Sequence, residues 1–162
     1  MSIDWFGEGI DPTSLPKSLQ AAHAYWVSLA GDGGLPTRDH FNPLALSDDI
    51  QSHVAIFEVA SPSGEARGNV RLAGAAVIAF YGAGLGSQSL RELVHEPRRD
   101  LVDDLSEIFA DGGGHLPILA RIDRPRLKPD STLHVLILPL REEPGRSRLV
   151  AAVYHFDKAG TV

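Results

Sequence analysis

The sequence contains no cysteine among its 162 residues, and Met1 is its only methionine. The absence of cysteine excludes disulfide bonds, cysteine-ligated zinc or iron–sulfur sites, and thiol nucleophiles. A chain without thiols is compatible with a reducing compartment, so we expect a cytoplasmic protein.

Long apolar runs are also missing. The longest, residues 73–81, is roughly half of the ~20 residues that a membrane-spanning helix needs. The first residues, Met-Ser-Ile-Asp-Trp-Phe-Gly-Glu, lack the basic and apolar regions of a signal peptide. We therefore expect neither membrane insertion nor secretion.

Basic residues are fewer than acidic residues. Fifteen Lys and Arg against 21 Asp and Glu give a formal net charge of −6, with a pI near 5.6. A nucleic-acid partner would need a basic face, so we expect none. The one local basic group is typical of a solvated loop or strand edge, and it consists of Arg121, Arg124, Arg126 and Lys128.

What the sequence does contain is enough apolar material for one globular domain, with 43% hydrophobic and 22% charged residues. We divide it into a flexible lead at 1–12, an N-terminal helix and linker at 13–34, one domain at 35–157 and a tail at 158–162.

A helix is predicted after Thr13 or Ser14, either of which is a suitable N-cap. Its apolar residues recur every three or four positions and form a narrow seam, which consists of Leu15, Leu19, Ala22, Trp26 and Leu29. The Gly-rich residues 31–34 end the helix. The seam either packs on the same chain or contacts a second molecule, as a partner or dimer interface.

Apolar runs predict five strands, at residues 53–60, 69–73, 115–123, 132–140 and 148–156. In the second strand, Val70 and Leu72 alternate with Arg71 and are expected on one buried face. Short helices are expected at 74–82 and 89–94, and a longer one from Pro97. Strands that follow one another across short loops indicate an antiparallel sheet and an α+β fold.

The last two predicted strands are apolar at both odd and even positions, so both faces of the sheet must be buried by other parts of the protein. The short helices can cover one face. The N-terminal helix or a second subunit remains for the other.

Several short motifs resemble a family of stand-alone PAS-type proteins, found mainly in alphaproteobacteria and long described as a domain of unknown function. The motifs are Tyr25-Trp26, Leu35-Pro36-x-Arg38-x-x-Phe41-x-Pro43, Arg71-Leu72-Ala73-Gly74, Gly82-x-Gly84-Leu85-x-x-x-x-Leu90 and Leu138-Pro139-Leu140. Asn42 stands where the family often has Asp, and either residue can cap the following turn.

The resemblance implies a PAS fold, with a five-stranded antiparallel sheet and short helices on one face. The N-terminal helix would pack on the other face or in a dimer. It also implies sensing and protein–protein signalling rather than catalysis, with a partner such as a histidine kinase. The family fixes no universal ligand, so the cofactor stays unknown.

Nine residues are expected to face inward between the sheet and the short helices. They are Ala55, Phe57, Val70, Leu72, Val77, Phe80, Leu93, Ile118 and Ala120. They form either a packed core or an apolar pocket for a small apolar or aromatic metabolite.

The sequence motifs that usually indicate a catalytic or metal site are missing or have the wrong spacing. The glycines at 82–86 lack the spacing of a dinucleotide-binding loop, and no GxSxG or HExxH occurs. The acid pairs at 48–49 and 103–104 are typical of solvated helix faces. Four histidines share no ligand spacing, although neighbouring strands could bring them together; they are His53, His115, His134 and His155.

The residues that hold cofactors in PAS relatives can be compared with the residues that this chain contains. Versions that trap flavin or a cinnamyl chromophore use a cysteine, which this chain lacks. Haem would need a histidine ligand, and His95 is the least unsuitable candidate. The leading hypothesis is therefore a non-catalytic signalling module that regulates a partner. A small-molecule sensor is the alternative, and a small enzyme on an α+β scaffold is third.

Overall fold

The fold is described by a computed structural model, which covers residues 2–6, 10–30, 34–60, 70–81, 116–123, 130–141 and 148–158. Its strands are β1 (Ser2–Phe6), β2 (Val54–Ala60), β3 (Val70–Ala73), β4 (Ile118–Asp123), β5 (Ser131–Pro139) and β6 (Arg148–Lys158). Its helices are α1 (Lys17–Ala30), α2 (Asp48–Gln51) and α3 (Ala75–Tyr81), with 3₁₀ turns η1 (Pro12–Ser14) and η2 (Pro43–Ala45). The helices predicted at 89–94 and from Pro97 lie outside the described residues.

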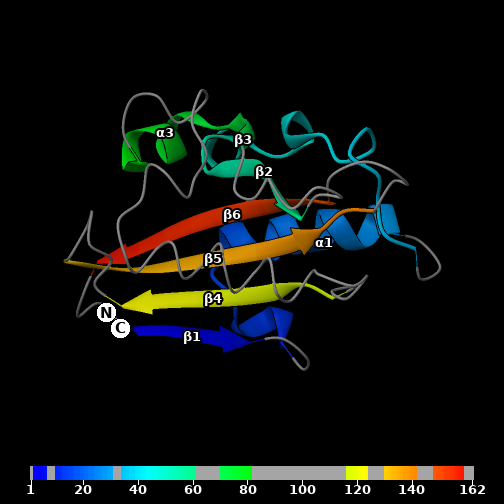
Figure 1. The fold of residues 1–162 in the computed structure, drawn as a ribbon. Helices are drawn as coiled ribbons and strands as arrows, with labels where there is room; N and C mark the ends of the chain where they lie inside the picture. The colour runs from blue at the N-terminus through cyan, green and yellow to red at the C-terminus, as the bar shows by residue number, and fades with distance from the viewer. Residues whose placement is uncertain are drawn as a thin grey trace.

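The strands form one antiparallel sheet in the order β1-β4-β5-β6-β2-β3 (Figure 1). Strands β2 to β6 are the five that the sequence predicts, so the α+β architecture is confirmed. The long pairing of β5 with β6, from Ser131↔Lys158 to Pro139↔Val150, forms the centre of the sheet.

The N-terminal residues correct one prediction. Residues 1–12 were expected to be a flexible lead, but β1 pairs with β4 from Ser2↔Asp123 to Phe6↔Leu119. This sixth strand covers a sheet edge that would otherwise expose unpaired backbone groups. Ser2, Ile3, Asp4 and Trp5 alternate polar and apolar side chains, which is a short strand pattern that ends at Gly7 and Gly9.

Both faces of the sheet are apolar and covered, as predicted from the apolar residues at odd and even positions of β5 and β6. Alternate residues of β5 belong to opposite clusters: Leu133, Val135 and Ile137 lie in one, and Leu136 and Leu138 in the other. The first cluster includes Val77 of α3, and the second includes the buried seam of α1. Figure 1 shows α1 running along the sheet behind β5 and β6.

Helix α1 packs on the sheet of its own chain. Leu15, Leu19, Ala22 and Trp26 are buried there, and Leu29 is partly buried in the same cluster. The Trp26 indole N–H donates a buried hydrogen bond of 2.8 Å to the Pro139 carbonyl. The helix begins at Lys17, later than predicted, because Asp11 rather than Thr13 or Ser14 caps the preceding 3₁₀ turn.

The segment after α1 is tied to it by an aromatic pair. The rings of Tyr25 and Phe41 lie 5.4 Å apart between centroids. The Tyr25 hydroxyl accepts from the Asn42 N–H at 3.0 Å and donates to the His40 carbonyl at 3.3 Å. The Tyr-Trp motif therefore has an architectural role, since it joins the helix to the chain that leads into β2.

Arg141 fixes the start of the same segment from the end of β5. Its backbone N–H donates to the Pro36 carbonyl at 2.8 Å, and its Nε donates to the Leu35 carbonyl at 3.1 Å. Arg38 donates to the Phe41 carbonyl at 3.2 Å. The Leu, Pro, Arg and Phe of this motif thus help to hold the path of the chain between α1 and β2.

Candidate functional site

Six polar side chains form two rows across β4, β5 and β6. The strand register aligns Arg121 with His134 and His134 with His155. Two residues further along, it aligns Asp123 with Thr132 and Thr132 with Asp157. These residues alternate with apolar ones of the α3-side cluster, so both rows lie on the face that α1 covers.

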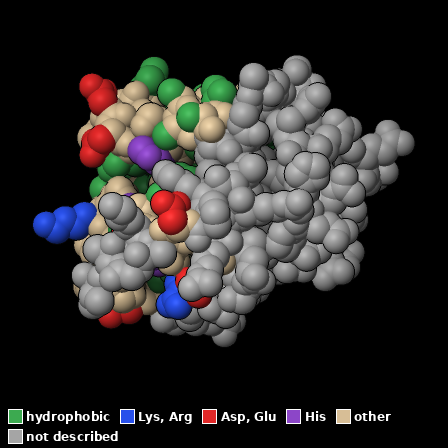
Figure 2. Space-filling model, turned by 90° about the vertical axis from the view of Figure 1, so that its left-hand side faces the viewer, with side chains coloured by type: hydrophobic (Ala, Val, Ile, Leu, Met, Phe, Trp, Pro, Cys, Tyr) green, Lys and Arg blue, Asp and Glu red, His purple; other side chains and the backbone are tan. Residues whose placement is uncertain are grey.

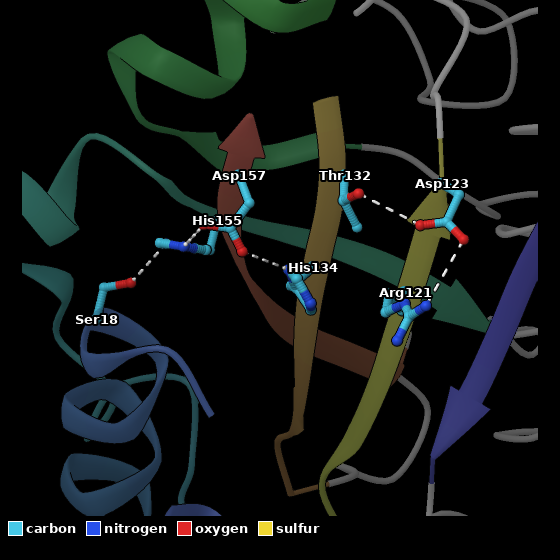
Figure 3. A network of polar contacts seen from close by, with 7 residues as sticks. All are labelled: Ser18, Arg121, Asp123, Thr132, His134, His155 and Asp157. Carbon is cyan, nitrogen blue, oxygen red and sulfur yellow. Dashed lines mark hydrogen bonds and ion pairs between the residues drawn. The ribbon is translucent and has the colours of Figure 1, made fainter. Parts of the chain in front are cut away.

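The rows are joined by hydrogen bonds and ion pairs (Figure 3). The shortest connects His155 Nε2 with Asp157 Oδ1 at 2.8 Å. The other ring nitrogen of His155, Nδ1, lies 3.2 Å from the Ser18 hydroxyl in the first turn of α1. His134 Nδ1 lies 3.5 Å from Asp157 Oδ2, so one carboxylate faces two imidazoles.

The β4 side of the site is a weaker extension of this network. Arg121 lies 3.7 Å from Asp123 Oδ2, and the Thr132 hydroxyl donates to Asp123 Oδ1 at 3.3 Å. We call the seven residues the polar cluster: Ser18, Arg121, Asp123, Thr132, His134, His155 and Asp157. Histidine and acidic side chains reach the surface on the face shown in Figure 2.

The two histidines differ in their surroundings. The His134 side chain is 17% exposed and that of His155 is 28% exposed. Burial lowers the pKa of His134, the nearby Asp157 opposes this, and His155 and Arg121 lower it further. Within the described part of the chain, His134 Nδ1 makes no hydrogen bond, although Asp157 Oδ2 lies 3.5 Å away.

The arrangement can hold and pass on a proton. His155 connects a hydroxyl to a carboxylate through its two ring nitrogens, and either nitrogen can carry a hydrogen. Among the residues that the structure describes, no group of three His, Cys, Asp or Glu side chains has the geometry of a metal site. Proton binding is a chemistry that these side chains support.

Sequence reasoning found only part of this cluster. It left open that histidines of neighbouring strands converge, and the rings of His134 and His155 do so at 6.0 Å between centroids. His53 lies elsewhere, beside Phe156, with its Nδ1 2.8 Å from the Asp49 carbonyl, and His115 is outside the described residues. Ser18 gave no signal because 137 positions separate it from His155.

Most of the predicted ligand-binding residues gather in the α3-side core. Ala55, Phe57, Val77, Ile118 and Ala120 are buried in that cluster, and Val70 packs against it. Phe80 lies in α3, but only its backbone is described, and Leu93 lies outside the described residues.

Leu72 is an exception, because it lies in the α1-side cluster. The prediction that it shares a face with Val70 is wrong. The register pairs Ile56 with Leu72 and Phe57 with Val70, which leaves Arg71 as an extra residue in a β-bulge. The bulge reverses the side-chain alternation, and Arg71 forms an ion pair of 2.5 Å with the buried carboxylate of Glu58.

The predicted interface residues lie between α1 and the sheet. The side chains of Leu15, Leu19, Ala22 and Trp26 are covered by the sheet of the same chain. As placed, they are not accessible to a second molecule, so a partner would have to contact the outward face of α1.

An antiparallel sheet of six strands, with helices on both faces, defines a small α+β domain. A family model described as PAS domain matches residues 15–154 of this chain, which confirms the resemblance noted in the sequence. The chain belongs to that family. No curated protein and no solved structure matches it.

PAS domains are sensory and signalling modules, in general without catalytic activity, and they commonly mediate protein interactions. In the part of the chain that the structure describes, no helix has the length and apolarity needed to cross a membrane.

Proposed function

We propose that this protein is a non-catalytic PAS signalling module that regulates a partner, such as a histidine kinase, in the bacterial cytoplasm. Membership of the PAS family supports the signalling role. The outward face of α1 supports a contact with another protein, either the partner or a second copy of this chain.

The composition of α1 is the observation that carries this proposal. Ala21, Ala24 and Val27 are exposed, and Val27 retains 49% of its surface. Lys17 is the only Lys, Arg, Asp or Glu in the helix. A solvated surface helix usually carries charged residues of both signs on its outer face, so this composition favours a protein contact.

The test uses the full chain with Val27→Glu, which places a carboxylate on the outward face of α1. We expect at least a tenfold loss of affinity for the cognate histidine kinase, because the interface would bury an unpaired charge. Binding is measured by calorimetry after the kinase has been found by co-purification from the native host.

Leu44→Glu provides the matched control, since Leu44 is 75% exposed and belongs to η2 rather than to α1. It should bind as the unaltered chain does. Equal binding by both variants would contradict a contact through α1. Sedimentation of the same proteins shows whether the α1 face instead holds a homodimer.

The α3-side core supports a second candidate, a sensor of a small apolar molecule. Five of the predicted ligand-binding residues share one cluster there, including Phe57, Val77 and Ala120. Native mass spectrometry and a visible spectrum of the purified protein would detect a bound metabolite. Protein without additional mass or colour after purification from the native host would count against this candidate.

A further inference from the structure

We propose that the polar cluster is a proton-binding switch, in which His155 takes up a proton from solvent and transmits the change through Ser18 to the first turn of α1. Its regulatory meaning rests on the proposed signalling function. Proton binding itself does not, and it can be measured on the isolated chain.

The hydrogen bonds of His155 determine where the proton goes. An ionised Asp157 can only accept, so the neutral ring of His155 carries its hydrogen on Nε2, which donates to that carboxylate over 2.8 Å. Nδ1 is then bare and accepts from the Ser18 hydroxyl at 3.2 Å. Nδ1 is therefore the atom of His155 that is free to bind a proton.

Protonation reverses the hydrogen bond to α1. When Nδ1 gains a proton from solvent, it becomes a donor, and Ser18 Oγ must accept while its own hydrogen turns away. No covalent bond of the protein breaks in this step. The new bond is charge-assisted and therefore stronger than the neutral one, so the first turn of α1 experiences a different contact in each state.

The charges of the cluster favour one proton over two. With both histidines neutral, Arg121 opposes the two carboxylates of Asp123 and Asp157, which leaves one excess negative charge. A proton on His155 balances it. A further proton on His134 would lie in a more buried ring, 6.0 Å from the first and in the row of Arg121.

Polar and charged groups lie around His155 on neighbouring strands and on α1. Strand β4 contributes Arg121 and Asp123, β5 contributes His134, β6 contributes Asp157, and α1 contributes Ser18. On β1, Asp4 is the register partner of Arg121. The nearest carboxylate, Asp157, lies 2.8 Å from His155 and stabilises the positive charge that the ring gains.

The experiment follows the histidine rings and the backbone amides of residues 17–20 by NMR from pH 5 to 8, on the full chain. We expect the amide signals of the first turn of α1 to move with the same midpoint as the His155 ring. Asp157→Asn should move that midpoint to lower pH, because it removes the carboxylate that lies 2.8 Å from the ring and stabilises its charged form.

Two variants separate transmission from proton binding. Ser18→Ala should leave the His155 ring titrating but reduce the response of the residue 17–20 amides at least threefold. His134→Asn should preserve that response, since the hydrogen bond described for the Ser18 hydroxyl is to His155. An unchanged amide response in Ser18→Ala, or its loss in His134→Asn, would overturn the proposal. Partner binding is not needed, so a failed kinase interaction would not affect the result.

Discussion

Gly74 occupies a position at which no side chain fits. A Cβ atom built there would lie far inside van der Waals contact with the carbonyl oxygens of Gln51 and Ser52. The Gly74 N–H donates to the Val54 carbonyl at 2.8 Å, so the backbone cannot simply move away. The glycine of the Arg-Leu-Ala-Gly motif therefore allows α2, β2 and β3 to approach closely.

Replacement of Gly74 by alanine should therefore lower the free energy of unfolding by about 1–3 kcal/mol, as overpacking against fixed backbone does. Urea denaturation measures the change. Gly34→Ala is the matched control, because the nearest atom to its Cβ is the end of the Arg141 side chain, at 3.1 Å, which can shift. Similar losses at both positions would contradict the steric explanation.

A pH dependence of stability is expected from His134. Burial lowers its pKa in the folded protein below the ordinary value of 6.5. The unfolded chain then binds more protons between the folded pKa and 6.5, so the free energy of unfolding falls as the pH falls through this range.

His134→Asn should reduce this acid-side loss, which is measured by urea denaturation between pH 7.5 and 5. His40→Asn, at an exposed position, serves as the control for the loss of an imidazole. A profile for His134→Asn that matches the parent would rule out the predicted role of burial.

At the level of elements, helix α1 is attached to the sheet by apolar burial and by the hydrogen bond of the Trp26 indole to Pro139. Trp26→Phe removes the donor and leaves a buried carbonyl without this partner. We expect a loss of about 1–3 kcal/mol in the free energy of unfolding, measured by chemical denaturation. Val27→Phe alters the neighbouring exposed position and should change stability by less than about 0.5 kcal/mol.

The elements also show what could be predicted from the sequence. Strands β5 and β6 were predictable because their apolar residues occur at both parities, which only a sheet covered on both faces accommodates. The face of Leu72 was not, because a bulge at Arg71 depends on the pairing with β2. The polar cluster was only partly foreseeable, since its register and the approach of Ser18 arise from tertiary structure.

In the whole molecule, β1 stands apart from the family core. The family match begins at residue 15, whereas β1 ends at Phe6 and, among the described strands, pairs with β4 alone. The five strands β2 to β6 form a continuous sheet without it. The first strand is therefore an addition that covers the edge of β4 rather than part of the core.

Deletion of residues 1–8 should leave a folded protein with near-native circular dichroism. It exposes the unpaired backbone groups of β4, so we expect the truncated chain to self-associate as its concentration rises. Sedimentation velocity over a hundredfold concentration range measures this association. A chain with Ile3→Pro, which places a proline within β1, should show an intermediate tendency because proline interrupts strand pairing. A truncated chain that unfolds would show instead that β1 belongs to the minimal domain.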